Sequence, residues 1–125
     1  MAGIYIHVPF CRKKCSYCDF HFSTTFHSYR ERLLKTMVRE LRERLSELED
    51  PVKTIYFGGG TPSLLSKKEL QGFLDVFNPH TLVEEITLEV NPEDLTHDNL
   101  TDWESLGINR LSIGIQSLNE TLLHW

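Results

Sequence analysis

The sequence predicts an α/β fold in which parallel strands alternate with helices. Two observations indicate it: short runs rich in β-branched and aromatic residues recur along the chain, and each is followed by a segment with the pattern of a helix. Strands separated by helices form βαβ units, whose strands pair in parallel and whose helices lie outside the sheet. Four such units make either half of a (β/α)8 barrel or most of an open sheet.

The first strand is expected at residues 3–8 (GIYIHV), buried and ended by Pro9, and a long helix is expected at residues 25–49. Apolar residues recur there every three or four positions, which is the spacing of one helix face. This stripe consists of Phe26, Tyr29, Leu33, Met37, Leu41, Leu45 and Leu48. A second strand at residues 52–57 (VKTIYF) runs directly into the sequence GGGTPS.

The second helix begins with a capping box, Ser66 with Glu69 three residues later, and ends before Asn78-Pro79. Its core stripe is expected to be Leu70, Phe73, Leu74 and Phe77. A third strand at residues 86–90 (ITLEV) leads into Asn91-Pro92-Glu93.

A third helix is expected at residues 97–106, with Thr96 as its cap and Gly107 as its stop. Its inward side chains are expected to be Leu100 and Trp103. The fourth strand is expected at residues 109–115 (NRLSIGI), and the last residues have the pattern of the first turns of another helix. We therefore expect residues 1–125 to be the N-terminal portion of a longer protein, with no internal domain boundary.

Composition excludes several classes of function. The chain has 125 residues, of which 40% are hydrophobic and 25% charged, and its formal net charge of -5 argues against nucleic acid as a partner. It has no apolar run of the roughly 18 to 20 residues that a transmembrane helix needs. The N-terminus also lacks the pattern of a secretory signal, so we expect a cytoplasmic protein.

Polar groups are expected where ligands gather in parallel α/β folds, beyond the carboxyl ends of the strands. GGGTPS either lets its backbone approach a ligand or forms a tight turn, and taken alone the turn is the better interpretation. Glu89, near the end of the third strand between apolar neighbours, is typical of a ligand-binding carboxylate. Gln116, after the fourth strand, is either a ligand-binding amide or a turn residue.

The cysteines are the sharpest signal. Cys11, Cys15 and Cys18 have the spacing C-x3-C-x2-C, and the basic residues between them favour thiolates. Three thiols indicate a metal centre with one position left open, and the basic residues would offset the negative charge of an iron–sulfur cluster. The alternative is a zinc site completed by His21. His7, on the first strand, is expected to be a core histidine and not a ligand.

These motifs, in their order along the chain, resemble the radical S-adenosylmethionine superfamily. The segment YIHVPFC with the three cysteines, then GGGTPS, EVNPE and GIQS, is most similar to the oxygen-independent coproporphyrinogen III oxidase-like proteins. The resemblance implies a partial (β/α) barrel with a [4Fe-4S] cluster on Cys11, Cys15 and Cys18, whose fourth iron takes S-adenosylmethionine. It also implies reductive cleavage of that cosubstrate to a 5′-deoxyadenosyl radical.

The resemblance implies roles for residues outside the cysteine motif as well. All of them are expected to contact S-adenosylmethionine: Tyr5, Tyr17, Gly59, Gly60, Thr61, Glu89 and Gln116. The glycines and the threonine would meet its methionine portion, and the glutamate and glutamine would hold the ribose and neighbouring polar atoms. The catalytic residues themselves are not identified by the sequence.

Residue 20 distinguishes two branches of the family that this chain resembles. Coproporphyrinogen dehydrogenases carry a fourth cysteine two positions after the third, where this chain has Phe20. In having Phe20 at this position, the chain resembles the haem chaperone branch. This resemblance implies haem or porphyrin, haem acceptor proteins and an electron donor protein as partners. It also implies that haem is held beyond Trp125. An active dehydrogenase and, from another class, a zinc-stabilised binding module are the alternatives.

Overall fold

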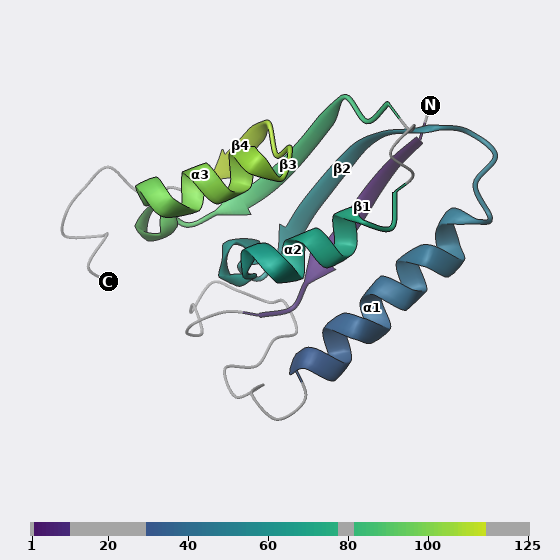
Figure 1. Ribbon diagram of the computed structural model, residues 1–125, viewed down its shortest axis with the longest axis horizontal. Coiled ribbons are helices and arrows are strands. Elements are labelled where there is room, and N and C mark those ends of the chain that lie inside the picture. Colours follow the sequence, from purple (N-terminus) through teal and green to yellow (C-terminus); the bar gives the residue numbers. More distant parts are fainter. Residues whose placement is uncertain (1, 11–29, 78–81, 115–125) are drawn as a thin grey trace.

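The computed structural model describes residues 2–10, 30–77 and 82–114, and these form a four-stranded parallel sheet with helices on one face (Figure 1). The strands are β1 (Ala2–Val8), β2 (Val52–Gly59), β3 (Glu85–Val90) and β4 (Arg110–Ile113). The helices are α1 (Arg30–Leu45), α2 (Lys67–Leu74) and α3 (His97–Ser105), with 3-10 turns η1 (Pro62–Leu64) and η2 (Pro92–Asp94). The predicted α/β class and parallel pairing are confirmed.

The strand order β1-β2-β3-β4 decides between the two architectures that the sequence left open. Every crossover steps to the next strand in the same direction, and right-handed crossovers of that kind place all their helices on one face. A doubly wound sheet needs a point where the order reverses, and the described strands contain none. The arrangement is that of a barrel wall, with one face turned outward to the helices and one turned inward.

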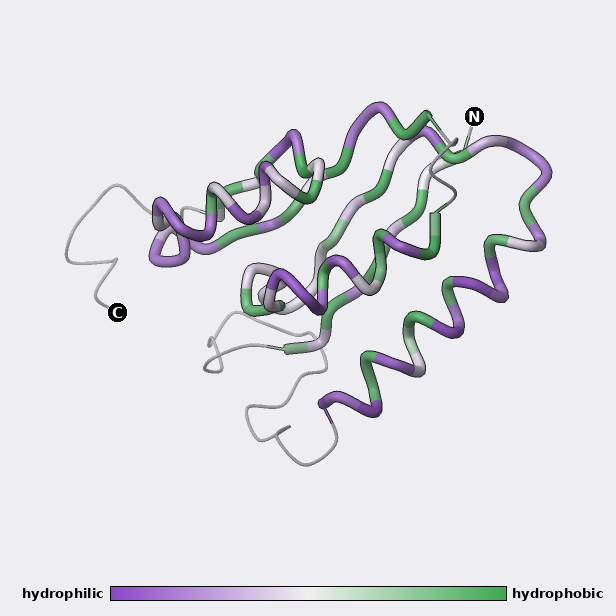
Figure 2. The backbone as a smooth tube through the Cα atoms, in the orientation of Figure 1, coloured by the Kyte–Doolittle hydropathy of each residue, from purple (hydrophilic) through white to green (hydrophobic). Residues whose placement is uncertain are grey.

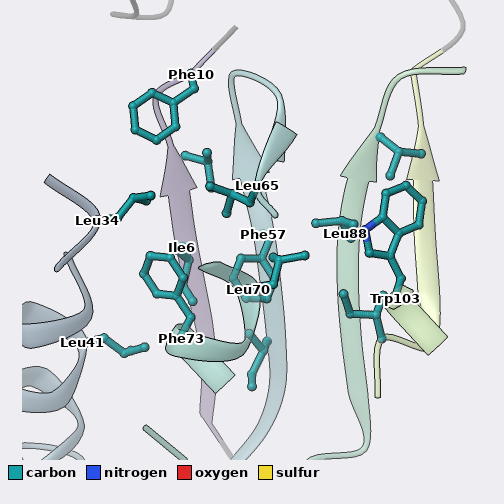
Figure 3. Packing of buried hydrophobic residues seen from close by; sticks show 14 of the residues in the cluster. Ile6, Phe10, Leu34, Leu41, Phe57, Leu65, Leu70, Phe73, Leu88 and Trp103 are labelled. Carbon is teal, nitrogen blue, oxygen red and sulfur yellow. The ribbon is translucent and has the colours of Figure 1, made fainter. Parts of the chain in front are cut away.

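The hydrophobic core lies between the sheet and the helices (Figure 3). Alternate strand residues point into it, among them Ile6, Phe57 and Leu88, and Phe57 packs edge-on against Phe73 of α2 with ring centroids 5.9 Å apart. Figure 2 shows that hydrophobic and hydrophilic residues alternate along α1 with the helical period. This period is what predicted α1 from the sequence.

The capping predictions are confirmed. Ser66 accepts a hydrogen bond from the backbone N–H of Glu69, whose side chain in turn accepts from the N–H of Ser66. Thr96 caps α3 by accepting from the N–H of Asn99, and Gly107 ends that helix with a φ of 93°. Caps are satisfied within four residues, so they can be predicted from local sequence.

The predicted end of the first helix was wrong. Helix α1 ends at Leu45 and not at Glu49, and the chain then tightens into turns in which the N–H groups of Glu47 and Leu48 donate to the carbonyls of Arg44 and Leu45. Leu48 is consequently exposed. Residues 25–29, where the predicted helix began, and Ile115, where the fourth strand ended, lie outside the described residues.

The predicted end of the second helix and one predicted core position were also wrong. Helix α2 ends at Leu74, so Phe77 follows the helix, where it is partly buried and packs against the core. In α3, Trp103 is buried as expected, whereas Leu100 is 42% exposed. A three-residue spacing places two side chains on the same side of a helix, but it does not say how far the neighbouring sheet extends beneath them.

No helix among the described residues is both long and apolar enough to cross a membrane.

Candidate functional site

The carboxyl ends of β1, β2 and β3 form one edge of the sheet, where the loops that follow these strands contact one another. The N–H groups of Gly60 and Thr61 donate to the carbonyls of Val8 and Phe10, at 2.7 and 2.6 Å. These bonds join the glycine-rich loop to the residues directly before the cysteine segment. Since both N–H groups are engaged within the fold, a ligand contact at these residues has to use other atoms.

The inward face of the sheet brings Tyr5 of β1 and Glu89 of β3 together above Gly58 of β2. A Cβ placed on Gly58 would lie 2.5 Å from Glu89 Oε1, 2.7 Å from Tyr5 Cε2 and 2.8 Å from the Tyr5 hydroxyl. No side chain other than the hydrogen of glycine leaves room for this convergence. The two strands are not neighbours, so the glycine between them is what allows their side chains to meet.

Two more aromatic side chains extend this cluster along the inward face. The Tyr5 hydroxyl lies 3.2 Å from His7 Nδ1, and which of the two donates depends on the tautomer of the imidazole. The Tyr5 ring also stacks on Tyr56 with a centroid distance of 5.8 Å. These contacts hold the Tyr5 ring over the sheet although much of its surface is exposed.

His7 is not a core histidine, so the prediction for it was wrong. It is exposed on the inward face, because β1 packs against helices on one face only. The expectation that the first strand is buried as a whole was wrong for the same reason: Tyr5 and His7 alternate with the buried Ile6 and Val8.

The glycine-rich loop contains the tight turn that the sequence predicted. Gly59 has a φ of 107°, a conformation that side chains rarely adopt. A Cβ there would lie 2.8 Å from both His7 Nδ1 and the carbonyl oxygen of Val8. The structure therefore bears out the tight turn, which also brings the backbone of the loop close to β1.

The ionisation of Tyr5 responds to this environment. Partial burial, then the negative charge of Glu89 and the neighbouring Tyr56, raise the pKa of Tyr5 above its usual 10.0. The phenol is thus neutral at physiological pH and keeps its proton for hydrogen bonding. A neutral phenol beside a carboxylate offers a ligand one donor and one charged acceptor within a few ångströms.

A buried hydrogen bond ties the loops after β2 and β3 to each other. Ser63 Oγ donates to Asp94 Oδ2 at 2.7 Å, and both residues are buried. The backbone carbonyl of Asp94 accepts from the side-chain amide of Asn99 and the N–H of Thr96. The loops at the candidate site are therefore fixed by polar contacts beneath it.

The structure brings together some of the predicted site residues. Tyr5, Gly59, Gly60, Thr61 and Glu89 all lie at the carboxyl edge or on the inward face beside it, with Thr61 buried. The remaining predicted site residues lie outside the described residues: Cys11, Cys15, Cys18, Tyr17 and Gln116. His21, the fourth ligand of the zinc alternative, lies outside them as well.

Three residues at the site were missed from the sequence: Gly58, Tyr56 and His7. Two-residue alternation places Tyr5 with His7, and Tyr56 with Gly58, on one face of their own strands, and the register pairs Tyr5 with Tyr56 and His7 with Gly58. In a parallel pair, residues in register point to the same face of the sheet. The missing information was the register itself.

The arrangement fits a polar ligand that carries both positive charge and hydroxyl groups. On the inward face, the carboxylate of Glu89 and the neutral phenol of Tyr5 lie over Gly58, where the sheet carries no side chain. S-adenosylmethionine, with its sulfonium, ammonium and ribose hydroxyls, has this chemistry. Among residues 2–10, 30–77 and 82–114, no three His, Cys, Asp or Glu side chains gather closely enough to hold a metal ion.

The family follows from a comparison with known proteins. The model of the radical SAM superfamily matches residues 5–125, so the chain belongs to that superfamily. Membership implies an iron–sulfur cluster and S-adenosylmethionine.

The chain is also similar to individual proteins. The chain is 35% identical to the heme chaperone HemW of Bacillus subtilis (strain 168), over 98% of this chain and 34% of the relative. It is 38% identical to heme chaperone HemW of Escherichia coli (strain K12), over 97% and 33%. It also resembles the mitochondrial radical S-adenosyl methionine domain-containing protein 1 of Danio rerio, with 34% identity over 94% of this chain and 28% of that protein. The chain spans about a third of the length of the HemW relatives.

A solved structure has the same fold. The coproporphyrinogen III oxidase HemN from Escherichia coli, a radical SAM enzyme, superposes with a TM-score of 0.79 and 26% identity. The match covers 98% of this chain and 29% of that chain. The fold is therefore that of the N-terminal part of a radical SAM barrel, as the sequence predicted.

Proposed function

We propose that this chain is the cluster- and cosubstrate-binding part of a haem chaperone of the radical SAM superfamily. Cys11, Cys15 and Cys18 would hold a [4Fe-4S] cluster, which supplies one-electron reduction of S-adenosylmethionine when bound. The observation that carries the proposal is the convergence of Tyr5 and Glu89 above Gly58, beside the strand that leads to the cysteines. The names of the bacterial relatives support the haem chaperone part.

The residues around the site have separate tasks in this proposal. Glu89 would accept hydrogen bonds from the ribose hydroxyls or the ammonium group, and the neutral Tyr5 phenol would donate one. Gly59 would give the ligand access to the backbone, while Tyr17 and Gln116 would complete the contacts from segments outside the described residues. Closure of the site would exclude water from the reactive cosubstrate.

The proposed partners follow from the chaperone role. They are haem, an acceptor protein that receives it, and a protein that donates electrons to the cluster. We place the protein in the cytoplasm, because a reducing compartment keeps the three thiols available for iron. The net charge of -5 favours these partners over nucleic acid.

A second candidate function is oxygen-independent coproporphyrinogen III dehydrogenation, favoured by the structural match to HemN. Phe20 stands where the dehydrogenase branch has its fourth cysteine, and this argues against it. We expect Phe20→Cys alone to create no such activity. Conversion of coproporphyrinogen III by that single variant would contradict this expectation.

The deciding experiment is anaerobic reconstitution of the full-length protein that contains this chain with iron and sulfide, followed by addition of haem or of coproporphyrinogen III. We expect about four irons per chain, stable haem binding, and no decarboxylated product. Formation of product would favour the dehydrogenase. Cys15→Ala should abolish the cluster and His21→Ala should retain it; loss of metal in His21→Ala, from a parent that is colourless and contains zinc, would favour the zinc module.

A further inference from the structure

A single arginine connects the two described ends of the cysteine segment. Residues 11–29 lie between Phe10, the last described residue after β1, and Arg30, the first residue of α1. The Arg30 guanidinium lies over the Phe10 ring, with its carbon 5.0 Å from the ring centroid. Figure 3 shows Phe10 beyond the arrowhead of β1, above Leu34 and Leu65 in this view.

Arg30 also joins both ends to the start of α2. Its Nε and Nη2 donate to the two carboxylate oxygens of Glu69 at 3.2 and 2.8 Å, and Nη2 donates to the carbonyl of Leu64 at 3.0 Å. This fork geometry is specific to a guanidinium, which is planar and presents several donors at once. Arg30 and Glu69 are only 28% and 26% exposed, so the pair is shielded from solvent more than an ordinary surface ion pair.

The partners of Arg30 are themselves fixed. Glu69 Oε1 accepts from the backbone N–H of Ser66 at 2.8 Å as part of the capping box of α2. Phe10 is buried, and its carbonyl accepts from the N–H of Thr61 at 2.6 Å. Both ends of the cysteine segment are thus held against the same stretch of chain, from Thr61 to Glu69, that follows β2.

We propose that Arg30 is a positioning residue for the proposed cluster, holding the two ends of the cysteine segment together through Phe10, Leu64 and Glu69. The inference rests on the proposed function, because it assigns the cluster to the three cysteines. The proposal assigns Arg30 no direct contact with iron or cosubstrate. Its loss lets the ends of the segment separate, which exposes bound iron to competing ligands.

The test measures the loss of iron from the reconstituted protein to a chelator under anaerobic conditions. Arg30→Ala should lose iron about tenfold faster than the parent, the factor expected when a shielded fork contact and a cation–π contact are removed together. Arg39→Ala is the matched control, because Arg39 lies on the same helix. Among its described contacts, its Nε pairs with Glu43 Oε1 of that helix at 3.3 Å. It should lose iron at the parent rate.

A conservative variant separates positioning from mere charge. Arg30→Lys keeps the positive charge but cannot make the fork to Glu69 and lie flat over Phe10 at once, so we expect about threefold faster iron loss. Phe10→Leu keeps an apolar side chain and removes the ring, and should also speed the loss. If Arg30→Ala does not fold, these two variants carry the test, and parent rates in both overturn the inference.

A second measurement needs no cluster. In the iron-free protein, the Thr61 amide hydrogen should exchange several-fold faster in Arg30→Ala than in Arg39→Ala, because the Phe10 carbonyl that accepts it is no longer held. Equal exchange in the two variants overturns the inference whatever the cluster does. Equal iron loss overturns it too, provided the parent holds its cluster. A parent that takes up no more iron than Cys15→Ala overturns the proposed function instead.

Discussion

The carboxylate of Glu89 lies beside the phenol of Tyr5, although their strands are separated by a third. Both side chains reach over β2 at Gly58, where the absence of a Cβ leaves the necessary space. This relationship joins three segments that the sequence separates by some thirty to fifty positions. It marks the inward face as the candidate site, and the predictions below concern this site and the loops beneath it.

Replacing Glu89 with Gln should lower the pKa of Tyr5 toward its usual value of 10.0. Burial of the phenol also raises this pKa and survives the substitution, so the change is partial. An ultraviolet titration of tyrosinate, compared between parent and variant and assigned with Tyr5→Phe, measures it. Affinity for S-adenosylmethionine should fall at least about tenfold, because a charged hydrogen-bond acceptor is lost. Identical titrations in parent and variant would show that the two groups do not interact.

Gly58→Ala should impair the site more than the fold. The added methyl group meets Glu89 and Tyr5 side-chain atoms at 2.5 to 2.8 Å, and these side chains can move where backbone could not. We expect a loss of about 1 kcal/mol in unfolding free energy and at least about a tenfold loss of S-adenosylmethionine affinity.

The matched control for Gly58→Ala is Gly72→Ala. A Cβ on Gly72 meets nothing within 4 Å, and the residue lies inside α2. Alanine there should raise the unfolding free energy by about 0.5 to 1 kcal/mol and leave cosubstrate affinity unchanged. Urea unfolding and calorimetric titration of both variants check the pair; equal affinities in the two would refute the convergence at Gly58.

Ser63→Ala should destabilise the protein by about 1 to 3 kcal/mol, because it removes a donor from the buried Asp94 carboxylate. Ser63→Thr keeps the hydroxyl and serves as the control for the hydrogen bond itself. The free energy of unfolding in urea is the measurement. A loss no larger for alanine than for threonine would mean that the bond does not hold the two loops together.

Acid should weaken the attachment of α1 to α2 through Glu69. Burial opposes ionisation of this carboxyl, but hydrogen bonds from Ser66 and the charge and hydrogen bonds of Arg30 outweigh it and lower its pKa below the usual 4.5. The folded protein therefore binds this proton less readily than the unfolded chain does, so the stabilisation is present above about pH 4.5 and is lost as the pH falls through the folded value.

The variant that tests this acid dependence is Glu69→Gln. It should reduce the decline of unfolding free energy below that pH by about 1 kcal/mol. Glu43→Gln, which changes an exposed carboxylate on α1, is the control and should follow the parent profile. A decline as steep in Glu69→Gln as in the parent would rule out this carboxyl as the source.

Local patterns in the sequence were enough for much of the fold. The caps at Ser66 and Thr96 and the stop at Gly107 were predicted correctly, because each depends on hydrogen bonds or a backbone conformation within a few residues. The period of α1 and the alternation around Glu89 were also sufficient, since periodicity reveals which side chains share a face. The exposure of Leu100 was not predicted, because it depends on how far the neighbouring sheet extends beneath α3.

The sequence alone determined the elements, their parallel arrangement and, through the order of its motifs, the resemblance to the radical SAM superfamily. Tertiary structure decided that the strands follow one another without reversal, that His7 faces inward, and that Gly58 is the point where Tyr5 and Glu89 meet. The reason is physical: helix and strand signals come from neighbours along the chain, whereas the register between strands is set by packing across the sheet. Only that register could bring residue 5 to residue 58 and both to residue 89.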